Sequence, residues 1–293
     1  MITDDEFTEQ FHGAVIRLVL LSHQIPAGWE TSAIGSRAFR QQVQVGFRIA
    51  DRILLPETAS DSPQHSLMLL TLPDTTPAAD FSAHQPATES LRRWVAAGDP
   101  SEDAVPMLIQ LQGVLMCVGT NRAAVSGSPE RIQSVTGAVL EHFWLQTELQ
   151  QIEHQTASRW SELEEDTPAA FEWTDAMLAR REQLQQRFQT MIIVKAKLAR
   201  LAPLIESPAA WPPTLASQAA ERLREKSRLP DRLQFLRDQL DVFERVYELC
   251  GQRMSDFISS RKSHTLEWII VVLLAFETLL LVVDLLGTLT TTP

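Results

Sequence analysis

The sequence contains few of the residues from which catalytic and cofactor sites are commonly built. Its 293 residues include 2 cysteines and 11 glycines. Cys117 and Cys250 match no CxxC or metal-ligand spacing, which excludes a disulfide scaffold and favours buried thiols in a reducing compartment. The chain has no phosphate-binding, dinucleotide-binding or nucleophile-elbow glycine motif, and its seven histidines form no HExxH motif. We therefore expect no catalytic residue, metal or cofactor, and a protein that is not an enzyme.

Positive charge is also scarce, because the formal net charge is −11. This balance argues against general binding to nucleic acid. Residues 180–228 are an exception, with ten basic and four acidic side chains. They could face RNA, anionic lipid or an acidic partner, or they could pair with the chain's own acidic residues. The basic side chains of this segment, called the basic block below, are Arg180, Arg181, Arg187, Lys195, Lys197, Arg200, Arg222, Arg224, Lys226 and Arg228.

What the chain does have is one long hydrophobic run, from Trp268 to Leu286. As a helix, these 19 residues would span roughly 30 Å, the thickness of a bilayer's hydrocarbon core. Leu, Ile, Val and Phe occupy 14 of the positions and favour insertion by roughly 4–8 kcal/mol. We therefore predict a transmembrane anchor over residues 266–289. The alternative is a buried helix of a soluble core.

Two acidic residues interrupt this run. Glu277, near its middle, opposes insertion by about 3 kcal/mol. Asp284 lies seven residues later and therefore on the same helix face. The pair could form a polar seam between membrane helices. Alternatively, Asp284 reaches the headgroups and Glu277 is protonated in lipid.

The charges flanking the run predict the orientation of the chain. Arg253, Arg261 and Lys262 precede it and no basic residue follows it, so the amino-terminal bulk is expected on the cytoplasmic side. The first ten residues are acidic and fit neither a secretory signal nor a transit peptide. We expect a single-pass, tail-anchored protein of a bacterial inner membrane, or of the mitochondrial inner membrane if the source is eukaryotic.

Residues 1–125 alternate short apolar runs with turn signals and are predicted to form a small α/β domain. Ser66–Pro73 and Leu108–Val118 are the best strand candidates, and the runs 14–21 and 42–55 could be strand or helix.

Residues 129–262 are predicted to form a helical bundle or coiled-coil stalk. Ser128-Pro129-Glu130 starts a helix that Thr167-Pro168 should end, and further helices are expected over 175–205 and 215–229. The last helix carries an apolar heptad pattern, and no strong breaker separates it from the membrane run, so we expect one continuous rod. The pattern could pair within the chain or between chains. Its members are Leu233, Leu236, Leu240, Phe243, Tyr247, Cys250, Met254 and Phe257. The predicted fold class is therefore α+β with a single carboxyl-terminal transmembrane helix.

Four segments resemble one known family. Residues 111–119 (LQGVLMCVG) resemble its apolar–Gly–apolar–Gly strand, and Asp166-Thr167-Pro168 with Phe171 and Trp173 resembles its acidic-Pro-aromatic segment. The heptad helix follows, and residues 266–277 resemble its terminal anchor with an embedded glutamate. Over residues 105–285 the chain thus resembles the required-for-meiotic-nuclear-division family of membrane proteins. The resemblance implies a non-enzymatic membrane scaffold, and mitochondrial relatives are linked to translation at the inner membrane.

These features together predict a membrane scaffold that organises partners, including the translation machinery, at the inner face of a membrane. Expected partners are the bilayer, other proteins and a second copy of the chain, with nucleic acid contacted only indirectly through a ribosome. Glu277 and Asp284 would serve lateral association, and the basic block would meet an acidic partner. Two alternatives are a membrane-tethered enzyme with its site in the amino-terminal domain, and an oligomeric channel or transporter subunit that uses Glu277.

Overall fold

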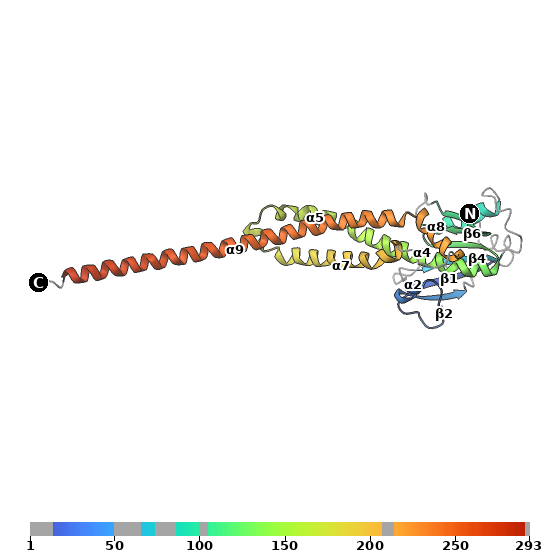
Figure 1. Ribbon diagram of the computed structural model, residues 1–293, viewed down its shortest axis with the longest axis horizontal. Coiled ribbons are helices and arrows are strands. Elements are labelled where there is room, and N and C mark those ends of the chain that lie inside the picture. The colour runs from blue at the N-terminus through green and yellow to red at the C-terminus, as the bar shows by residue number, and fades with distance from the viewer. Residues whose placement is uncertain (1–13, 50–65, 74–85, 100–104, 207–213, 291–293) are drawn as a thin grey trace. The chain divides into compact units, whose positions relative to one another are not determined.

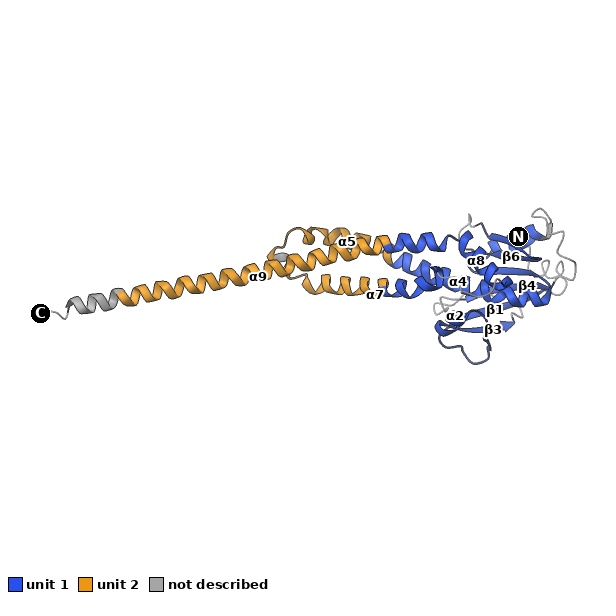
Figure 2. Ribbon diagram, in the orientation of Figure 1, with its two compact units in different colours: residues 1–155, 196–237 blue, residues 156–195, 238–293 orange. Residues whose placement is uncertain are grey.

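A computed structural model of the protein describes residues 14–49, 66–73, 86–99, 105–206 and 214–290 and shows a mixed α+β fold (Figure 1). The chain divides into two compact units (Figure 2). Unit 1 comprises residues 1–155 and 196–237, and unit 2 comprises residues 156–195 and 238–293. Helical residues 129–155 and 196–237 therefore cluster with the strands in unit 1. The acidic amino-terminal segment lies outside the described residues.

Unit 1 contains a seven-stranded sheet with the strand order β2-β3-β1-β4-β7-β6-β5. All neighbours pair antiparallel except β4 and β7, which are parallel. The strands are β1 (Val15–Ser22), β2 (Glu30–Ser32), β3 (Gln44–Ile49), β4 (Ser66–Pro73), β5 (Met107–Leu111), β6 (Val114–Val118) and β7 (Arg122–Gly127). The predicted strand at 66–73 is confirmed. Of the two runs that could have been strand or helix, 14–21 forms β1, and 42–55 forms β3 up to residue 49, beyond which it leaves the described residues.

The parallel contact between β4 and β7 needs a crossover, and α3 (Pro86–Ala96) lies between these strands in the sequence. Leu91 and Val95 of α3 belong to a buried cluster with Leu70 of β4 and Cys117 of β6. Both β6 and β7 are buried along their whole length, as expected for central strands covered on both faces. This cluster is one core of unit 1.

The prediction of one strand over Leu108–Val118 was wrong, because this segment is a hairpin of β5 and β6. Gln112 and Gly113 form its two-residue turn, and both have positive φ angles, 45° and 76°. Such turns match the right-handed twist of the flanking strands. The apolar residues on both sides of the turn made the segment look continuous in the sequence.

Helices make up most of the remaining described chain. They are α2 (Arg37–Gln42), α4 (Pro129–Ala157), α5 (Trp160–Asp166), the 3₁₀ turn η2 (Thr167–Ala170), α6 (Asp175–Leu178), α7 (Arg181–Glu206), α8 (Leu215–Lys226) and α9 (Leu229–Thr290). Pro129 is the first residue of α4, as predicted. The first long helix ends at Ala157, before the predicted break at Thr167-Pro168, which instead forms η2.

The expectation of one continuous helix into the hydrophobic run is confirmed by α9, which extends without a break from Leu229 to Thr290. Its heptad positions are buried from Leu233 to Cys250, and Met254 and Phe257 are half-buried. Within unit 2 this apolar stripe contacts helices of the same chain. The ring centroids of Phe243 and Trp160 of α5 are 4.9 Å apart, and those of Tyr247 and Phe188 of α7 are 5.9 Å apart.

Candidate functional site

The basic block lies on α7 and α8, except for Arg180, which precedes α7, and Arg228, which follows α8. Most of its members contact other residues of the chain. Arg180, Arg187 and Lys195 form ion pairs within unit 2. In unit 1, Arg224 and Lys226 donate hydrogen bonds to backbone carbonyl groups, those of Leu204 and Leu108. The remaining contacts are those of Arg200 with Gln42, Arg222 with Glu225, and Arg228 with Asp231.

Among the described residues, Arg181 and Lys197 are the members of the block that have no ion pair or hydrogen bond, and both are exposed. Arg222 and Arg228 remain largely exposed while pairing with a neighbour three residues along the chain. Such exposed pairs contribute little to stability, so their side chains are free to exchange partners.

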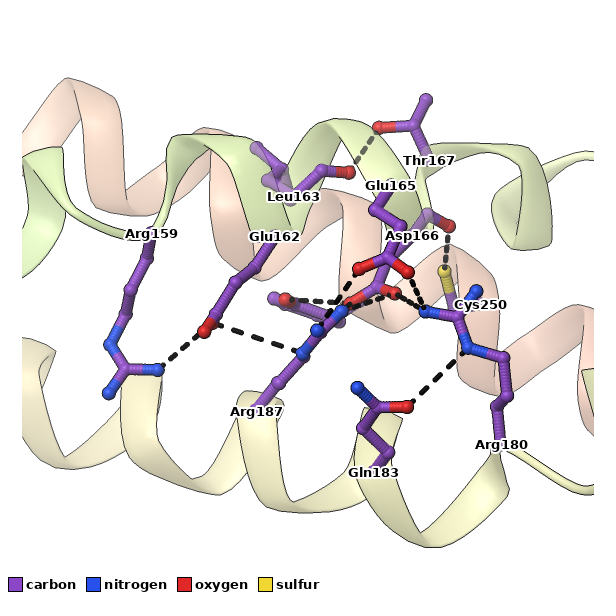
Figure 3. A network of polar contacts seen from close by, with 11 residues as sticks. Arg159, Glu162, Leu163, Glu165, Asp166, Thr167, Arg180, Gln183, Arg187 and Cys250 are labelled. Carbon is purple, nitrogen blue, oxygen red and sulfur yellow. Dashed lines mark hydrogen bonds and ion pairs between the residues drawn. The ribbon is translucent and has the colours of Figure 1, made fainter.

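Asp166, at the carboxyl end of α5, is the centre of a polar cluster in unit 2 (Figure 3). Its carboxylate has no exposed surface. Arg187 donates from one guanidinium nitrogen to both carboxylate oxygens, at 2.7 and 2.8 Å, and Arg180 donates to Oδ1 at 3.0 Å. The Tyr247 hydroxyl of α9 donates to Oδ2 at 3.2 Å. One carboxylate thus joins α5, α7 and α9, and we call these four residues the Asp166 clamp.

A second layer of contacts surrounds the clamp. Glu165 pairs with Arg180 at 3.0 Å and with Arg187 at 3.1 Å, and Glu162 pairs with Arg159 at 3.1 Å. The Cys250 thiol lies 3.7 Å from the Asp166 carbonyl oxygen. Every polar atom of the Asp166 carboxylate therefore has a partner, which is the condition under which a buried ion pair stabilises a fold.

Burial and nearby charges shift the pKa values of two clamp members, Tyr247 and Arg187, and of the adjacent Cys250. Burial, followed by the negative charge of Asp166, raises the pKa of Tyr247. The same two causes raise the pKa of Cys250 to about 11, so this thiol is protonated and unreactive at neutral pH. Burial opposes the charge of Arg187, but its hydrogen bonds to Asp166 and Glu165 outweigh this effect and raise its pKa. The cluster is built to hold helices together, with no activated nucleophile.

The hydrophobic part of α9 is exposed throughout its described side chains. Trp268 is 69% exposed, Leu273 61% and Leu281 68%. Length and composition make α9 the candidate membrane span among the described residues. Glu277 lies within this exposed stretch without an ion pair to another described residue. Asp284 belongs to α9 but lies beyond the residues whose side chains are described.

Unit 1 contains a cavity of about 820 Å³ that the sequence did not predict. Its walls come from the segment 34–41, the middle of α4, the last turn of α7 and one face of α8. Glu141, His142 and Arg224 line it together with apolar side chains. Gly35 and Gly137 approach each other closely at one wall of this cavity. The sequence contains both glycines, but only the fold shows that they are close. We call this cavity the α4–α8 pocket.

Other candidate chemistry is limited in the part of the chain that the structure describes. No group of three or more His, Cys, Asp or Glu side chains is placed to hold a metal ion there. Cys117 is buried in the sheet, and burial raises the pKa of its thiol to about 12 despite the nearby Arg92. Both thiols are therefore packing groups.

No protein-family model matches the chain, and no functionally characterised protein matches it either. The resemblance over residues 105–285 therefore stays a prediction, and the function is inferred from the geometry alone.

Proposed function

We propose that this protein is a single-pass membrane scaffold that holds its folded units at the cytoplasmic face of a bilayer. The observation that supports the proposal is the continuity of α9, whose residues 233–250 pack within the protein while residues 266–281 expose their apolar side chains. Water is a poor solvent for such a surface, since each large apolar side chain gains about 1.5–3 kcal/mol on leaving it. The hydrocarbon core of a bilayer supplies the missing environment.

The role of scaffold, rather than simple anchor, is supported by the contacts that the other helices of unit 2 make with α9. The Asp166 clamp and the Trp160–Phe243 contact both lie on the segment of α9 that precedes the span. Lys195 adds ion pairs to Asp241 and Glu244 of α9, the former at 2.7 Å. We propose that these helices form a stalk of bundle or coiled-coil type. A partner bound to unit 2 would be held at a fixed distance from the membrane.

Membrane insertion is tested by alkaline carbonate extraction of cell membranes. The full chain is expected in the pellet, and a chain ending at Ser263 in the supernatant. Val272→Arg together with Leu274→Asp places two charges in the span and is expected to release the protein, whereas the matched pair Val272→Leu and Leu274→Val should leave it in the pellet. Release of the unaltered chain by carbonate would overturn the proposal.

The scaffold role is tested by crosslinking the full-length protein in membranes and identifying what is recovered with it, with and without nuclease. Nuclease-sensitive recovery of ribosomal proteins would support a translation tether. Arg181→Glu with Lys197→Glu should then reduce the recovery, and Glu182→Lys on the same helix should not. Recovery of membrane proteins alone, unaffected by nuclease, would instead support lateral association through α9.

A further inference from the structure

The α4–α8 pocket has the size and construction of a ligand site. Its volume of about 820 Å³ lies within the usual range for small-molecule sites, about 300–1,000 Å³. All of its lining residues belong to unit 1. Apolar side chains such as Ile34, Leu145 and Leu204 make up much of the wall, and a few polar groups are placed among them. This mixture is typical of sites that enclose an apolar molecule and orient it through one polar group.

One wall is fixed by a close approach of the chain to α4. Gly137 lies against Gly35, and a side-chain carbon at position 137 would be 2.9 Å from the Gly35 nitrogen. Gly35 itself has a φ of 95°, which favours glycine. Ser36 then donates from its backbone nitrogen and its hydroxyl to the Glu141 carboxylate, at 3.3 and 3.0 Å. The wall is therefore anchored before any ligand enters.

The charges around the pocket favour an anion. Arg37 and Arg224 both line it, and the single lining carboxylate, that of Glu141, already accepts two hydrogen bonds from Ser36. Arg224 is half-buried and uses one guanidinium nitrogen to hold the Leu204 carbonyl oxygen at 3.3 Å. Its remaining N–H groups are available to an acceptor. The start of α8 at Thr214 adds the partial positive charge of a helix amino terminus.

His142 also belongs to the wall of the pocket, with its ring nitrogens buried away from the open space. It lines the pocket with 2% of its surface exposed, and neither ring nitrogen has a hydrogen-bond partner of normal geometry among the described residues. Burial lowers its pKa to about 4; Gln146 opposes the shift, and the charges of Arg232 and Arg224 add to it. The ring is therefore neutral at physiological pH and offers one donor and one acceptor. Its contribution to the site is a rigid, uncharged stretch of wall beside Arg224.

We propose that the α4–α8 pocket binds a small organic acid, with an apolar body against α4 and α8 and with Arg224 as the counter-ion of its carboxylate. This site goes beyond the proposed scaffold function, since it makes unit 1 a ligand-binding module. It also supports the alternative of a membrane-tethered enzyme with its site in the amino-terminal domain, because part of the pocket wall, residues 34–41, comes from that domain.

The test is equilibrium dialysis of the full-length protein in phosphatidylcholine nanodiscs against 2-naphthoate and 2-naphthamide, which have similar shapes and differ in charge. Empty nanodiscs correct for partition into lipid. We expect one naphthoate per chain, bound about tenfold more tightly than naphthamide, because a charge-assisted hydrogen bond distinguishes them. Equal binding of the two probes, or no saturable naphthoate binding at millimolar concentration, would overturn the proposal.

Variants on α8 locate the binding. Arg224→Gln should weaken naphthoate binding about tenfold and leave naphthamide binding little changed, while Arg224→Lys should keep the preference for naphthoate. Arg222→Gln, on the same helix but paired with Glu225, is the matched control and should bind as the unaltered protein does. Ala220→Trp fills the pocket and should abolish binding of both probes. Unchanged naphthoate binding in Arg224→Gln and Ala220→Trp would refute the assignment, and it would leave the membrane-anchor proposal untouched.

Discussion

A carboxylate with no exposed surface depends entirely on its neighbours for stabilisation, and Asp166 shows how this requirement was met. Two arginines and a tyrosine hydroxyl satisfy its oxygens. The same contacts bind Arg180 and Arg187, which the sequence offered as partner-binding residues. These two arginines therefore stabilise the protein's own fold, because both pair with the buried carboxylate of Asp166 in unit 2.

Substituting Asp166 with Asn should destabilise unit 2 by about 3–5 kcal/mol, because the change leaves the guanidinium of Arg187 without its main counter-ion. Thermal unfolding of the full-length protein in mild detergent, followed by circular dichroism, measures the loss. Glu165→Gln is the control: its side chain is 55% exposed, and its loss should cost less than about 1 kcal/mol. Equal unfolding temperatures for the two variants would show that the clamp does not act as described.

His142 should make unit 1 sensitive to acid. Its pKa in the folded protein is about 4, compared with about 6.5 for an exposed histidine, so the unfolded chain binds the proton more readily. Stability from this residue is complete above about pH 6.5 and falls as the pH drops to about 4, by about 3 kcal/mol in total. Urea unfolding across this range measures the slope. His142→Gln should flatten it, whereas His154→Gln, an exposed position on the same helix, should leave it unchanged.

The pairing of individual residues could not be predicted from the sequence. Arg187 and Asp166 are 21 positions apart, and Lys195 and Asp241 are 46 apart, so neither pair has a helical spacing that would reveal it. The sequence allowed both internal pairing and partner binding for the basic block. The structure gives most of its members internal contacts, and binding by Arg181 and Lys197 stays a prediction. The α4–α8 pocket was missed for the same reason, since four separate segments form its walls.

Among the elements, α9 supplies both the buried apolar stripe from Leu233 to Cys250 and the exposed hydrophobic run. No proline or bulge separates the two parts. Its period and hydropathy both follow directly from side-chain chemistry, which is why the sequence predicted it well. Strand β7, by contrast, was missed because Arg122–Gly127 is rich in alanine and carries an arginine and a serine. Its burial comes from its central place between β4 and β6, a property of topology.

Two glycines in different helices, Gly251 of α9 and Gly137 of α4, allow a matched test of how helix propensity and packing affect stability. Gly251 lies within α9 with no atom near the position of an added methyl group, so Gly251→Ala should raise stability by about 0.5–1 kcal/mol through helix propensity alone. Gly137→Ala in α4 gains the same propensity but meets the Gly35 backbone, and it should lower the unfolding temperature. Thermal unfolding of both variants provides the comparison, and a destabilising effect of Gly251→Ala would indicate that α9 bends at this position.

For the whole molecule, the open question is whether one chain acts alone. Glu277 lies on an exposed apolar helix surface, where an acidic group is costly unless a second helix offers a partner. The lateral-association proposal and the channel alternative both require several chains.

Crosslinking in mild detergent and mass photometry should therefore show an oligomer for the unaltered protein and a shift toward monomer for Glu277→Leu. Thr278→Leu, at the adjacent position, should not cause this shift. A protein that is monomeric at all concentrations would remove the channel alternative and leave the scaffold anchored by α9 alone.

The absence of a break in α9 has a consequence for how this protein would respond to its lipid environment. At about 1.5 Å per residue, a span that is too long for a thin bilayer tilts instead of bending. In the proposed membrane-anchored state, a straight α9 would pass this tilt on to Tyr247 and the clamp that contacts it. Bilayer thickness would then become a mechanical signal, and unit 2 would be the part of the molecule that receives it.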